Sequence, residues 1–506
     1  MKRLSKVQSY ALLIAGGVIF PLGLAPFKLW PAVIVSMAIL FQSLRQPSIK
    51  QAFFNSMAYG FGLFIAGASW LYVSIHEYGF IAAPLAVIAT TLFCLFLAAI
   101  FAAPFTLAAF LPSTPIALML GLPAIWVLSE WIRTWIFTGF PWLYAGYSHT
   151  DTWLNGWAPI GGVLWLSFIT ALAAVLCLWL VQGMGKRRSI LGPCAMLATL
   201  TVSGYFLQQV EWTEDWGEPI TVAIIQPNIP QNEKWSAQKQ RAILNQLAAQ
   251  TESYWGHDLV IWPEAAVPTI AQRIPQFMQS MKSRSVDSDS ILLTGIITYQ
   301  AEPRRNYSSV LAIGAEQGHY HKTRLVPFGE YVPLESLLRG LIEFFDLPMS
   351  SLSVGPPSQV PLSVKEQLIA TAICYEVVYP DLVARNSKEA TVILTVSNDT
   401  WFGESLGPLQ HMQMVRMRAL ENSKPIIRGT NNGISGLVDH QGDVYQRIKQ
   451  NSITELSGIV QPRAGQTPFS MTGSWPAVLL SLLIVCFLVV NRTKTNILEE
   501  SKNEIK

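Results

Sequence analysis

Long apolar segments separated by short polar ones occupy the first two hundred residues of the chain. A helix needs about 20 mainly apolar residues to cross the hydrocarbon core of a bilayer, because each residue advances about 1.5 Å. Only LPSTP (111–115) interrupts the apolar stretch from 80 to 128, so seven or nine spans would also fit the pattern. The segments that meet this length predict eight transmembrane helices, roughly at 8–27, 29–44, 52–74, 81–108, 115–137, 159–183, 189–207 and 474–490.

Basic residues cluster on one side of these predicted helices, and lysine and arginine in short loops are retained on the cytoplasmic side. Both chain ends are therefore predicted to be cytoplasmic, with the segment 208–470 on the opposite face. Residues 1–27 also resemble a signal peptide, but APF is a poor cleavage site and a second span follows at once, which favours an uncleaved helix. The clusters are Lys2, Arg3, Lys6, Arg45, Lys50, Lys186, Arg187, Arg188, Arg492 and Lys494.

Short β-branched runs alternate with helical patterns between 208 and 470, as in an α/β domain whose helices cover a sheet. The clearest helices are expected at 235–252 and 408–422, and GPPSQVPLS (355–363) is the most linker-like piece. Most of the runs are continuously apolar, which predicts strands buried on both faces. They are TVAIIQ (221–226), LVIW (259–262), ILLTGII (291–297), SSVLAI (308–313), LIATAIC (368–374), TVILTVS (391–397) and ISGLVD (434–439).

These patterns predict four parts of the chain: transmembrane helices in 1–207, a catalytic domain in 208–470, a last transmembrane helix in 471–492 and a cytoplasmic tail in 493–506. The composition agrees, because 51% of the residues are hydrophobic and only 13% are charged. The net charge of +3 comes mostly from the loops between the predicted spans, so nucleic acid is not an expected partner. Glu130 and Arg133 lie near the end of a predicted span and are expected to form an interfacial ion pair.

One of the five cysteines, Cys374, lies outside the predicted spans, at the end of the run LIATAIC. An exported domain usually pairs its cysteines or lacks them. A buried, inert strand thiol is the ordinary interpretation. The alternative is chemical, because sites in open α/β sheets assemble where strands end.

Two other strand ends carry the ionisable groups that a thiol nucleophile requires. The run VIWPE is expected to end at Pro263, which places Glu264 just past the sheet, while Lys322 and Glu330 follow the run SSVLAI. Each of these alone is equally typical of a solvated side chain. A thiol with a pKa near 8.5 is mostly protonated at neutral pH, so it needs an ammonium that lowers the pKa or a carboxylate that takes its proton.

Histidine is the other usual partner of a cysteine nucleophile, but none of the seven histidines is favoured by its position. His319 and His321 alternate at strand spacing without a third ligand at a suitable distance, so no metal site is expected. No other cofactor is expected either.

The three residues Glu264 in IWPE, Lys322 in HKTRLVPFGEYVP and Cys374 in AICYE resemble the Glu-Lys-Cys triad of the nitrilase superfamily. With the eight predicted spans, the chain resembles the apolipoprotein N-acyltransferase family over nearly its whole length. This resemblance implies a nitrilase-like αββα sandwich inserted into an eight-helix transmembrane bundle. The further motifs that carry it are SWLYVSIHEYG (69–79), TGFPWLYAGYS (138–148), IPQNEKW (229–235), FFDLPMSS (344–351), SNDTWFG (397–403) and RGTNNGISG (428–436).

The resemblance implies a role for each triad residue. Glu264 corresponds to the general base, Lys322 to the cation that stabilises the oxyanion, and Cys374 to the nucleophile. Trp235 is expected to shape the lipid-facing side of the pocket, and FFDLPM (344–349) is a candidate lid. The positions that match residues important for activity in the family are Glu330, Tyr375, Glu376 and Trp235.

The resemblance also implies the substrates and the location. The acyl donor would be a phospholipid, chiefly phosphatidylethanolamine, and the acceptor the α-amine of an S-diacylglyceryl cysteine at the start of an apolipoprotein. A monomer in the lipid bilayer of the bacterial inner membrane, with its catalytic domain on the periplasmic side, is expected to react by a ping-pong route. Two alternatives stay open: a membrane-tethered carbon-nitrogen hydrolase with the same triad, and a membrane receptor without enzymatic activity.

Overall fold

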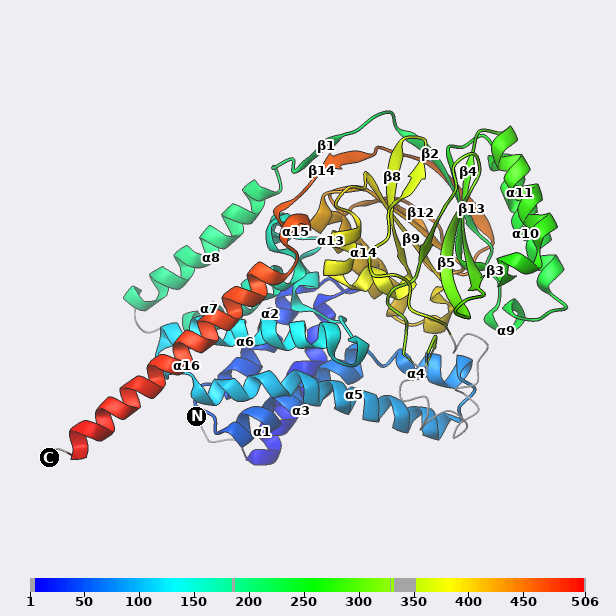
Figure 1. Ribbon diagram of the computed structural model, residues 1–506. Helices are drawn as coiled ribbons and strands as arrows, with labels where there is room; N and C mark the ends of the chain where they lie inside the picture. The colour runs from blue at the N-terminus through cyan, green and yellow to red at the C-terminus, as the bar shows by residue number, and fades with distance from the viewer. Residues whose placement is uncertain (1–4, 184–186, 328, 332–351, 505–506) are drawn as a thin grey trace. The chain divides into compact units, whose positions relative to one another are not determined.

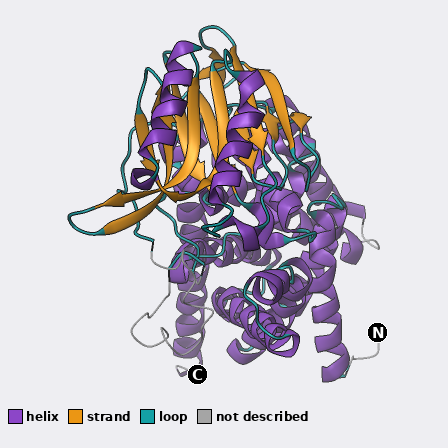
Figure 2. Ribbon diagram, turned by 90° about the vertical axis from the view of Figure 1, so that its right-hand side faces the viewer, coloured by secondary structure: helices purple, strands orange, loops and turns teal. Residues whose placement is uncertain are grey.

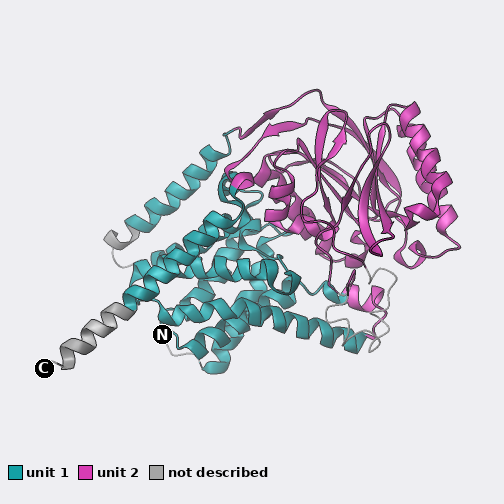
Figure 3. Cartoon of the chain, in the orientation of Figure 1, with its two compact units in different colours: residues 1–72, 83–210, 472–506 teal, residues 73–82, 211–471 magenta. Residues whose placement is uncertain are grey.

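A computed structural model describes residues 5–183, 187–327, 329–331 and 352–504 of the chain (Figure 1). The chain divides into two compact units (Figure 3). Unit 1 comprises Met1–Tyr72, Ala83–Val210 and Thr472–Lys506, and unit 2 comprises Val73–Ala82 and Glu211–Met471. All of the described strands belong to unit 2, whereas unit 1 is helical (Figure 2).

Each predicted span of unit 1 falls on a helix, because an apolar segment can satisfy all its backbone hydrogen bonds internally only as a helix. Within the described residues, five helices are long and apolar enough to cross a membrane, or six if Ile49–Gly67 and Leu71–Tyr78, bent by 63°, form one span. Trp30–Ser43 and Leu191–Leu207 are shorter apolar helices, so the count of eight spans stays a prediction. The helices are α1 (Lys6–Ile19), α2 (Trp30–Ser43), α3 (Ile49–Gly67), α5 (Ala83–Phe105), α6 (Pro115–Trp135), α7 (Ala158–Gly183), α8 (Arg187–Leu207) and α16 (Trp475–Glu504).

The expected interfacial ion pair of Glu130 and Arg133 is not present in the described part of unit 1. Both side chains are buried on α6 and each binds other groups. A Glu130 carboxylate oxygen accepts hydrogen bonds from the Trp126 indole and the Ala145 N–H, both at 2.7 Å. Arg133 donates to the Trp142 carbonyl at 2.9 Å. One helical turn separates the two in sequence, but these hydrogen bonds join each side chain to other partners.

The helix in the third predicted span is broken: α3 ends at Gly67, and the segment Val73–Ala82 belongs to unit 2. A π-helical turn, η2 (Ser74–Tyr78), packs there against Trp401. The Ser74 hydroxyl donates to the Trp401 carbonyl at 2.7 Å, and the Tyr78 and Trp401 rings meet edge to face with their centroids 5.8 Å apart.

Two six-stranded sheets form the centre of unit 2, with the strand orders β12-β11-β10-β9-β8-β7 and β13-β2-β3-β4-β5-β6. In each sheet three central strands are parallel and the outer ones antiparallel. The strands of the first sheet are β7 (Leu362–Val364), β8 (Gln367–Ile373), β9 (Val392–Ser397), β10 (Ile426–Thr430), β11 (Gly436–Val438) and β12 (Val444–Arg447). Those of the second are β2 (Ile220–Gln226), β3 (Leu259–Ile270), β4 (Ile291–Gln300), β5 (Arg305–Ile313), β6 (Gly318–His321) and β13 (Thr454–Val460).

Helices cover both outer faces of the paired sheets, which makes the predicted αββα sandwich (Figure 1). Alternate residues of β2 show why: Val222 and Ile224 enter the core between the sheets, whereas Ala223 and Ile225 pack under the helices. This two-residue period makes the strands apolar on both faces, as predicted. The covering helices are α10 (Gln240–Thr251) and α11 (Pro275–Asp287) on the second sheet, and α13 (Pro380–Asn386) and α14 (Gly407–Asn422) on the first.

Some local predictions are wrong. The helix expected from 235 begins only at Gln240, after a short turn α9 (Gln231–Lys234). The linker-like piece 355–363 contains the start of β7 and packs beside β6, where the Gln359 side chain pairs with the His321 backbone at 2.8 and 2.7 Å. The candidate lid 344–349 lies outside the described residues.

Candidate active site

Glu264 lies inside β3, at a break in the ladder between β3 and β4. The regular parallel register is lost between Trp262 and Val267. Gly295 of β4 faces this break, and a Cβ there would lie 2.6 Å from the Glu264 Cα atom, so only glycine allows the approach. The predicted strand end at Pro263 is therefore wrong: the strand bulges and continues, and the bulge carries the Glu264 side chain.

Lys322 directly follows β6, a strand that hydropathy alone did not predict. Its backbone is held on both sides, because its N–H donates to the Ser308 carbonyl and its own carbonyl accepts from the Gly355 N–H, both at 2.8 Å. Its side chain is only 1% exposed, and Nζ lies 3.0 Å from a Glu264 oxygen and 2.7 Å from a Glu330 oxygen. Two carboxylates, one in the β3 bulge and one in the segment after β6, thus hold one buried ammonium between them.

The charges of this cluster depend on one another. Burial alone would lower the pKa of the Lys322 ammonium, but the adjacent Glu264 and Glu330 carboxylates outweigh burial and hold that pKa well above its usual range. Burial raises the pKa of Glu330, and Lys322 opposes that rise. The second Glu330 oxygen accepts the Val326 N–H at 2.8 Å, which fixes the carboxylate in place. Lys322 is therefore charged and shared between two acids.

Cys374 follows β8 as the first residue of the 3-10 turn η10 (Cys374–Val378). Its φ of 53° lies in the left-handed region, which costs a residue other than glycine about 1 to 2 kcal/mol. Strain of this kind persists where the surrounding structure enforces it, and it is enriched at active sites. The thiol lies in the electrostatic field of Glu264 and Lys322. The three predicted triad residues are thus brought together.

The thiol is protonated in the resting site. Burial raises the pKa of the Cys374 thiol, the Glu264 charge raises it further, and Lys322 opposes both only in part because two carboxylates already neutralise it. The sequence left two routes to a thiolate: an ammonium that lowers the thiol pKa, or a carboxylate that takes the proton. This geometry favours the carboxylate.

Glu376 ties the end of β8 to the segment that carries Lys322. One carboxylate oxygen accepts from the Thr323 N–H at 2.6 Å and from the Thr323 hydroxyl at 2.7 Å, and the other accepts from the Ile373 N–H at 2.8 Å. Further donors are the Tyr320 hydroxyl and the Arg324 N–H. Glu376 thus links the residue before the thiol to the residue after Lys322.

The two predicted aromatic residues lie around this centre. Tyr375 meets Tyr379 edge to face with ring centroids 5.4 Å apart. Trp235 is half-buried and packs against a small apolar cluster that includes Leu325 and Tyr331. Trp235 therefore belongs to an apolar wall close to the turn that carries Lys322 and Glu330, and its expected role toward lipid stays a prediction.

Sequence reasoning missed several residues of the site. The Asn398 N–H donates to the second Glu264 oxygen at 3.0 Å, so Glu264 is held from both sides. Asn398 follows β9, and the rule that sites form at strand ends would have found it. Asp399 lies deeper: burial raises its pKa, but Arg428 at 2.7 Å and His411 at 3.2 Å outweigh burial and hold that pKa well below its usual range.

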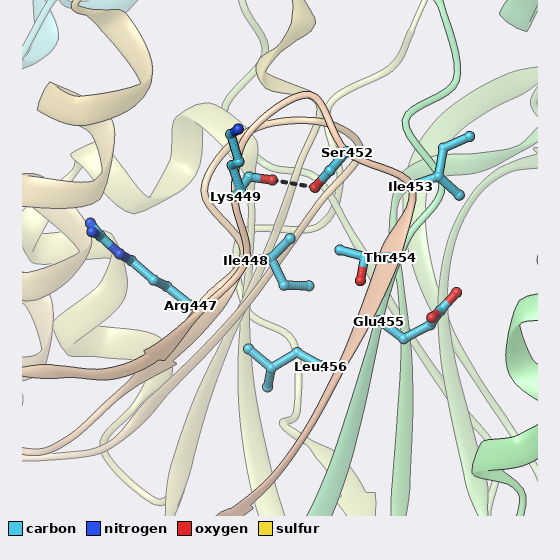
Figure 4. Close-up of a pocket in the computed structure, with 8 residues that line it drawn as sticks. All are labelled: Arg447, Ile448, Lys449, Ser452, Ile453, Thr454, Glu455 and Leu456. Atoms are coloured by element: carbon cyan, nitrogen blue, oxygen red, sulfur yellow. Dashed lines mark hydrogen bonds between the residues drawn. The ribbon is translucent and has the colours of Figure 1, made fainter.

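Among the described residues, no group of three or more histidine, cysteine, aspartate and glutamate side chains is placed to hold a metal ion. A hollow of about 490 Å³ opens beside the loop between β12 and β13, where the Ser452 hydroxyl donates to the Lys449 carbonyl at 2.6 Å (Figure 4). It contains no predicted site residue and is separate from the triad. It is lined by Arg447, Ile448, Lys449, Ser452, Ile453, Thr454, Glu455 and Leu456.

Comparisons with known proteins match both parts of the chain. Residues 16–176 match the model of the apolipoprotein N-acyltransferase N-terminal domain, and residues 221–468 match the carbon-nitrogen hydrolase model. A solved structure of Saccharomyces cerevisiae Nit3, a member of branch 10 of the nitrilase superfamily, is 16% identical with a TM-score of 0.38, covering 50% of this chain and 93% of that one.

Curated relatives align over nearly the full length. The apolipoprotein N-acyltransferases of Azotobacter vinelandii and of Pseudomonas aeruginosa strain PAO1 are each 41% identical, over 495 and 489 residues. The alignments cover 95% of both chains in the first case and 96% in the second. The Vibrio vulnificus protein of the same name is 37% identical over 95% of this chain and 96% of its own. With that identity over both of its parts, the chain belongs to the apolipoprotein N-acyltransferase family, a family of membrane acyltransferases.

Proposed function

We propose that the protein moves a fatty acyl chain from a phospholipid to Cys374, and from there to the α-amine of an S-diacylglyceryl cysteine at the start of an apolipoprotein. The observation that supports this most is the buried Lys322 ammonium. It lies 3.0 Å from Glu264 and 2.7 Å from Glu330, and its charge acts on the Cys374 thiol. A thiol, a base and a fixed cation are the groups that acyl transfer requires.

In the first half-reaction the Cys374 sulfur attacks the donor ester carbonyl while Glu264 takes the thiol proton. The resulting oxyanion is held by Lys322 and by a backbone N–H near Cys374, and one such donor contributes about 3 kcal/mol to the lowering of the barrier. The carbon-oxygen bond then breaks, and Glu264 returns its proton to the leaving alkoxide. A thioester and a lysophospholipid result.

In the second half-reaction the acceptor amine attacks the thioester carbonyl. Glu264 takes a proton from the nitrogen, the carbon-sulfur bond breaks, and the sulfur leaves as a thiolate that is reprotonated. The products are an amide and the free thiol, so one carboxylate serves both steps. We expect ping-pong kinetics, because the first product leaves before the second substrate reacts.

The membrane part follows from the nature of the substrates. Each CH₂ group of an acyl chain gains about 0.8 kcal/mol in an apolar medium, so the chain does not readily leave the bilayer and the thiol must come to it. We propose eight spans, with residues 208–470 as the catalytic domain on the periplasmic side of the bacterial inner membrane, in a monomer. Phosphatidylethanolamine is the proposed main donor.

The proposal is tested by intact-mass spectrometry of the purified chain in detergent. Phosphatidylethanolamine should add one acyl mass, peptide mapping should place it on Cys374, and a diacylated lipopeptide should then remove it. Cys374→Ala should abolish the adduct, whereas Cys194→Ala, at an exposed cysteine of α8, should leave it unchanged. Transfer to the lipopeptide without any adduct at position 374 would refute the thioester route.

The two alternatives give different products in the same experiment. A membrane-tethered hydrolase would release lysophospholipid and free fatty acid without N-acylated peptide. A receptor would bind lipid and lose nothing in a Cys374→Ser variant. Either pattern would replace the proposed function.

A further inference from the structure

A second lysine lies in the site and has no part in the steps described above. Lys234 is the last residue of the turn α9, in the motif IPQNEKW, and is only 1% exposed. Its Nζ donates to the backbone carbonyl of Glu264 at 3.2 Å. A buried lysine is rare unless it is paired, because its charge loses the stabilisation of water.

The turn that carries Lys234 is fastened to the residues around the triad. Asn431 exchanges two hydrogen bonds with the backbone of Ile229, at 3.0 and 2.8 Å. The Asn398 side chain donates to the Gln231 side chain at 2.8 Å, and the Asn398 N–H donates to the Glu264 carboxylate at 3.0 Å. The ammonium is therefore held at a fixed position beside Glu264.

Within the described part of the chain, Lys234 makes fewer hydrogen bonds than its ammonium could donate. An ammonium has three donors, and within the described residues the Glu264 carbonyl is the one acceptor that Lys234 reaches. The titratable groups whose charges act on it are the Glu264 carboxylate of β3 and the Cys374 thiol of η10. On its own turn, Glu233 pairs with the exposed Lys239 instead. The charges that act on the Lys234 ammonium are therefore those of the triad.

The charge balance of the site shows what this cation contributes. Glu264, Glu330 and Lys322 together carry one net negative charge, which opposes any further negative charge on the sulfur or on an oxyanion. Lys322 cannot offset that charge alone, because Glu330 is already bound to it at 2.7 Å. With Lys234 charged, the four groups sum to zero, and the negative charge that develops in the reaction meets a neutral site.

We propose that Lys234 is a positioning residue and the second cation of the acyl-transfer site: it holds the Glu264 peptide by its carbonyl and offsets the negative charge that forms at Cys374. This inference rests on the proposed role of Cys374 as nucleophile. It assigns the lysine of the IPQNEKW motif a task distinct from that of Lys322, whose ammonium already binds two carboxylates.

The test compares three substitutions in the full-length chain in detergent. Lys234→Met removes the charge at similar volume, and Lys234→Arg keeps it. Lys239→Met is the matched control, since Lys239 lies close in sequence but its side chain is 53% exposed and pairs with Glu233 at the surface. The readout is the rate at which iodoacetamide alkylates Cys374, followed by peptide mass spectrometry between pH 6 and 10, together with the rate of acyl-enzyme formation.

Loss of a nearby cation raises a thiol pKa by about one unit or more. Lys234→Met should therefore slow the alkylation of Cys374 at pH 7 about tenfold, while Lys239→Met should not change it. Burial lowers the pKa of Lys234 to about 8, so the wild-type ammonium loses its charge above that pH. The difference between wild type and Lys234→Met should then shrink toward pH 10, whereas Lys234→Arg should keep the faster rate.

Three outcomes decide the inference. A pH-dependent loss that Lys234→Arg rescues supports it. An unchanged alkylation profile in Lys234→Met overturns it, and so does a loss of equal size at every pH, since that would mean a purely structural role. Thermal unfolding of each variant identifies a folding defect, in which case Lys234→Gln replaces Lys234→Met. Failure of the proposed function itself would appear separately, as acyl transfer by Cys374→Ala.

Discussion

Replacement of Lys322 by methionine tests the charge cluster directly. The side chain is 1% exposed and lies between two carboxylates whose own side chains are 9% and 10% exposed, so its removal leaves two buried negative charges that repel each other. Breaking a buried pair by removing one partner costs about 3 to 5 kcal/mol, because an uncompensated charge is left behind. We expect a loss of that size in the free energy of unfolding of unit 2 at pH 8, together with loss of acyl transfer.

The loss should depend on pH in a defined direction. Without Lys322, burial and the neighbouring Glu264 charge raise the folded-state pKa of Glu330 further above its unfolded value of about 4.3. A carboxylate with a raised folded pKa gives up stability as the pH rises from the unfolded pKa through the folded one. The variant should therefore lie close to wild type near pH 5 and fall progressively below it toward pH 8.

The assay is thermal unfolding of the purified chain, followed by intrinsic fluorescence at several pH values. Lys365→Met is the matched control, because Lys365 also bridges two carboxylates, Asp258 at 2.8 Å and Asp289 at 3.0 Å, but is 31% exposed. A partly exposed ion pair contributes about 1 kcal/mol or less, so Lys365→Met should change the free energy of unfolding very little. Adding Glu330→Gln to Lys322→Met should recover part of the stability, though not the activity. Equal, pH-independent losses in Lys322→Met and Lys365→Met would refute the reasoning.

Two further predictions concern positioning. In wild type, backbone N–H groups donate to the Glu376 carboxylate, and Glu376→Gln would place an amide NH₂ against them. We expect a stability loss of about 1 to 3 kcal/mol and a fall in kcat at nearly constant KM. Wild-type kinetics would exclude the positioning role. Gly295→Ala would place a Cβ 2.3 Å from the Pro263 carbonyl oxygen and so displace the bulge that carries Glu264. Acyl-enzyme formation, measured by intact mass, should fall at least tenfold. The free energy of unfolding should fall by about 1 to 3 kcal/mol. In the control Gly192→Ala, the new Cβ would have no described atom within 4 Å beyond its chain neighbours and its own helix backbone, and an equal loss there would contradict the steric explanation.

Local patterns were sufficient for the elements and for part of the site. The apolar runs predicted the central strands, because a strand buried on both faces must be apolar at every position. Edge strands such as β6 and β12 were missed because their exposed or polar residues, among them His319 and Tyr445, do not form apolar runs. The true extent of β3 was missed because Pro263 marks a bulge there and not an end. The helix expected from 235 was too long for a related reason: the turn around Lys234 is held by tertiary hydrogen bonds that no helical period reflects.

What the sequence by itself determined is which parts of the chain are apolar enough for a membrane, that one cysteine lies outside them, and that Glu264, Lys322 and Cys374 match a family pattern. These are properties of single residues and their near neighbours. Only the tertiary structure decided that Lys322 is shared between two acids, that the thiol keeps its proton, and that Lys234 and Asn398 reach Glu264. Those features depend on groups separated by 58 residues for Lys322 and 134 for Asn398, and the electrostatic energy of a buried charge depends on distance in space and not along the chain.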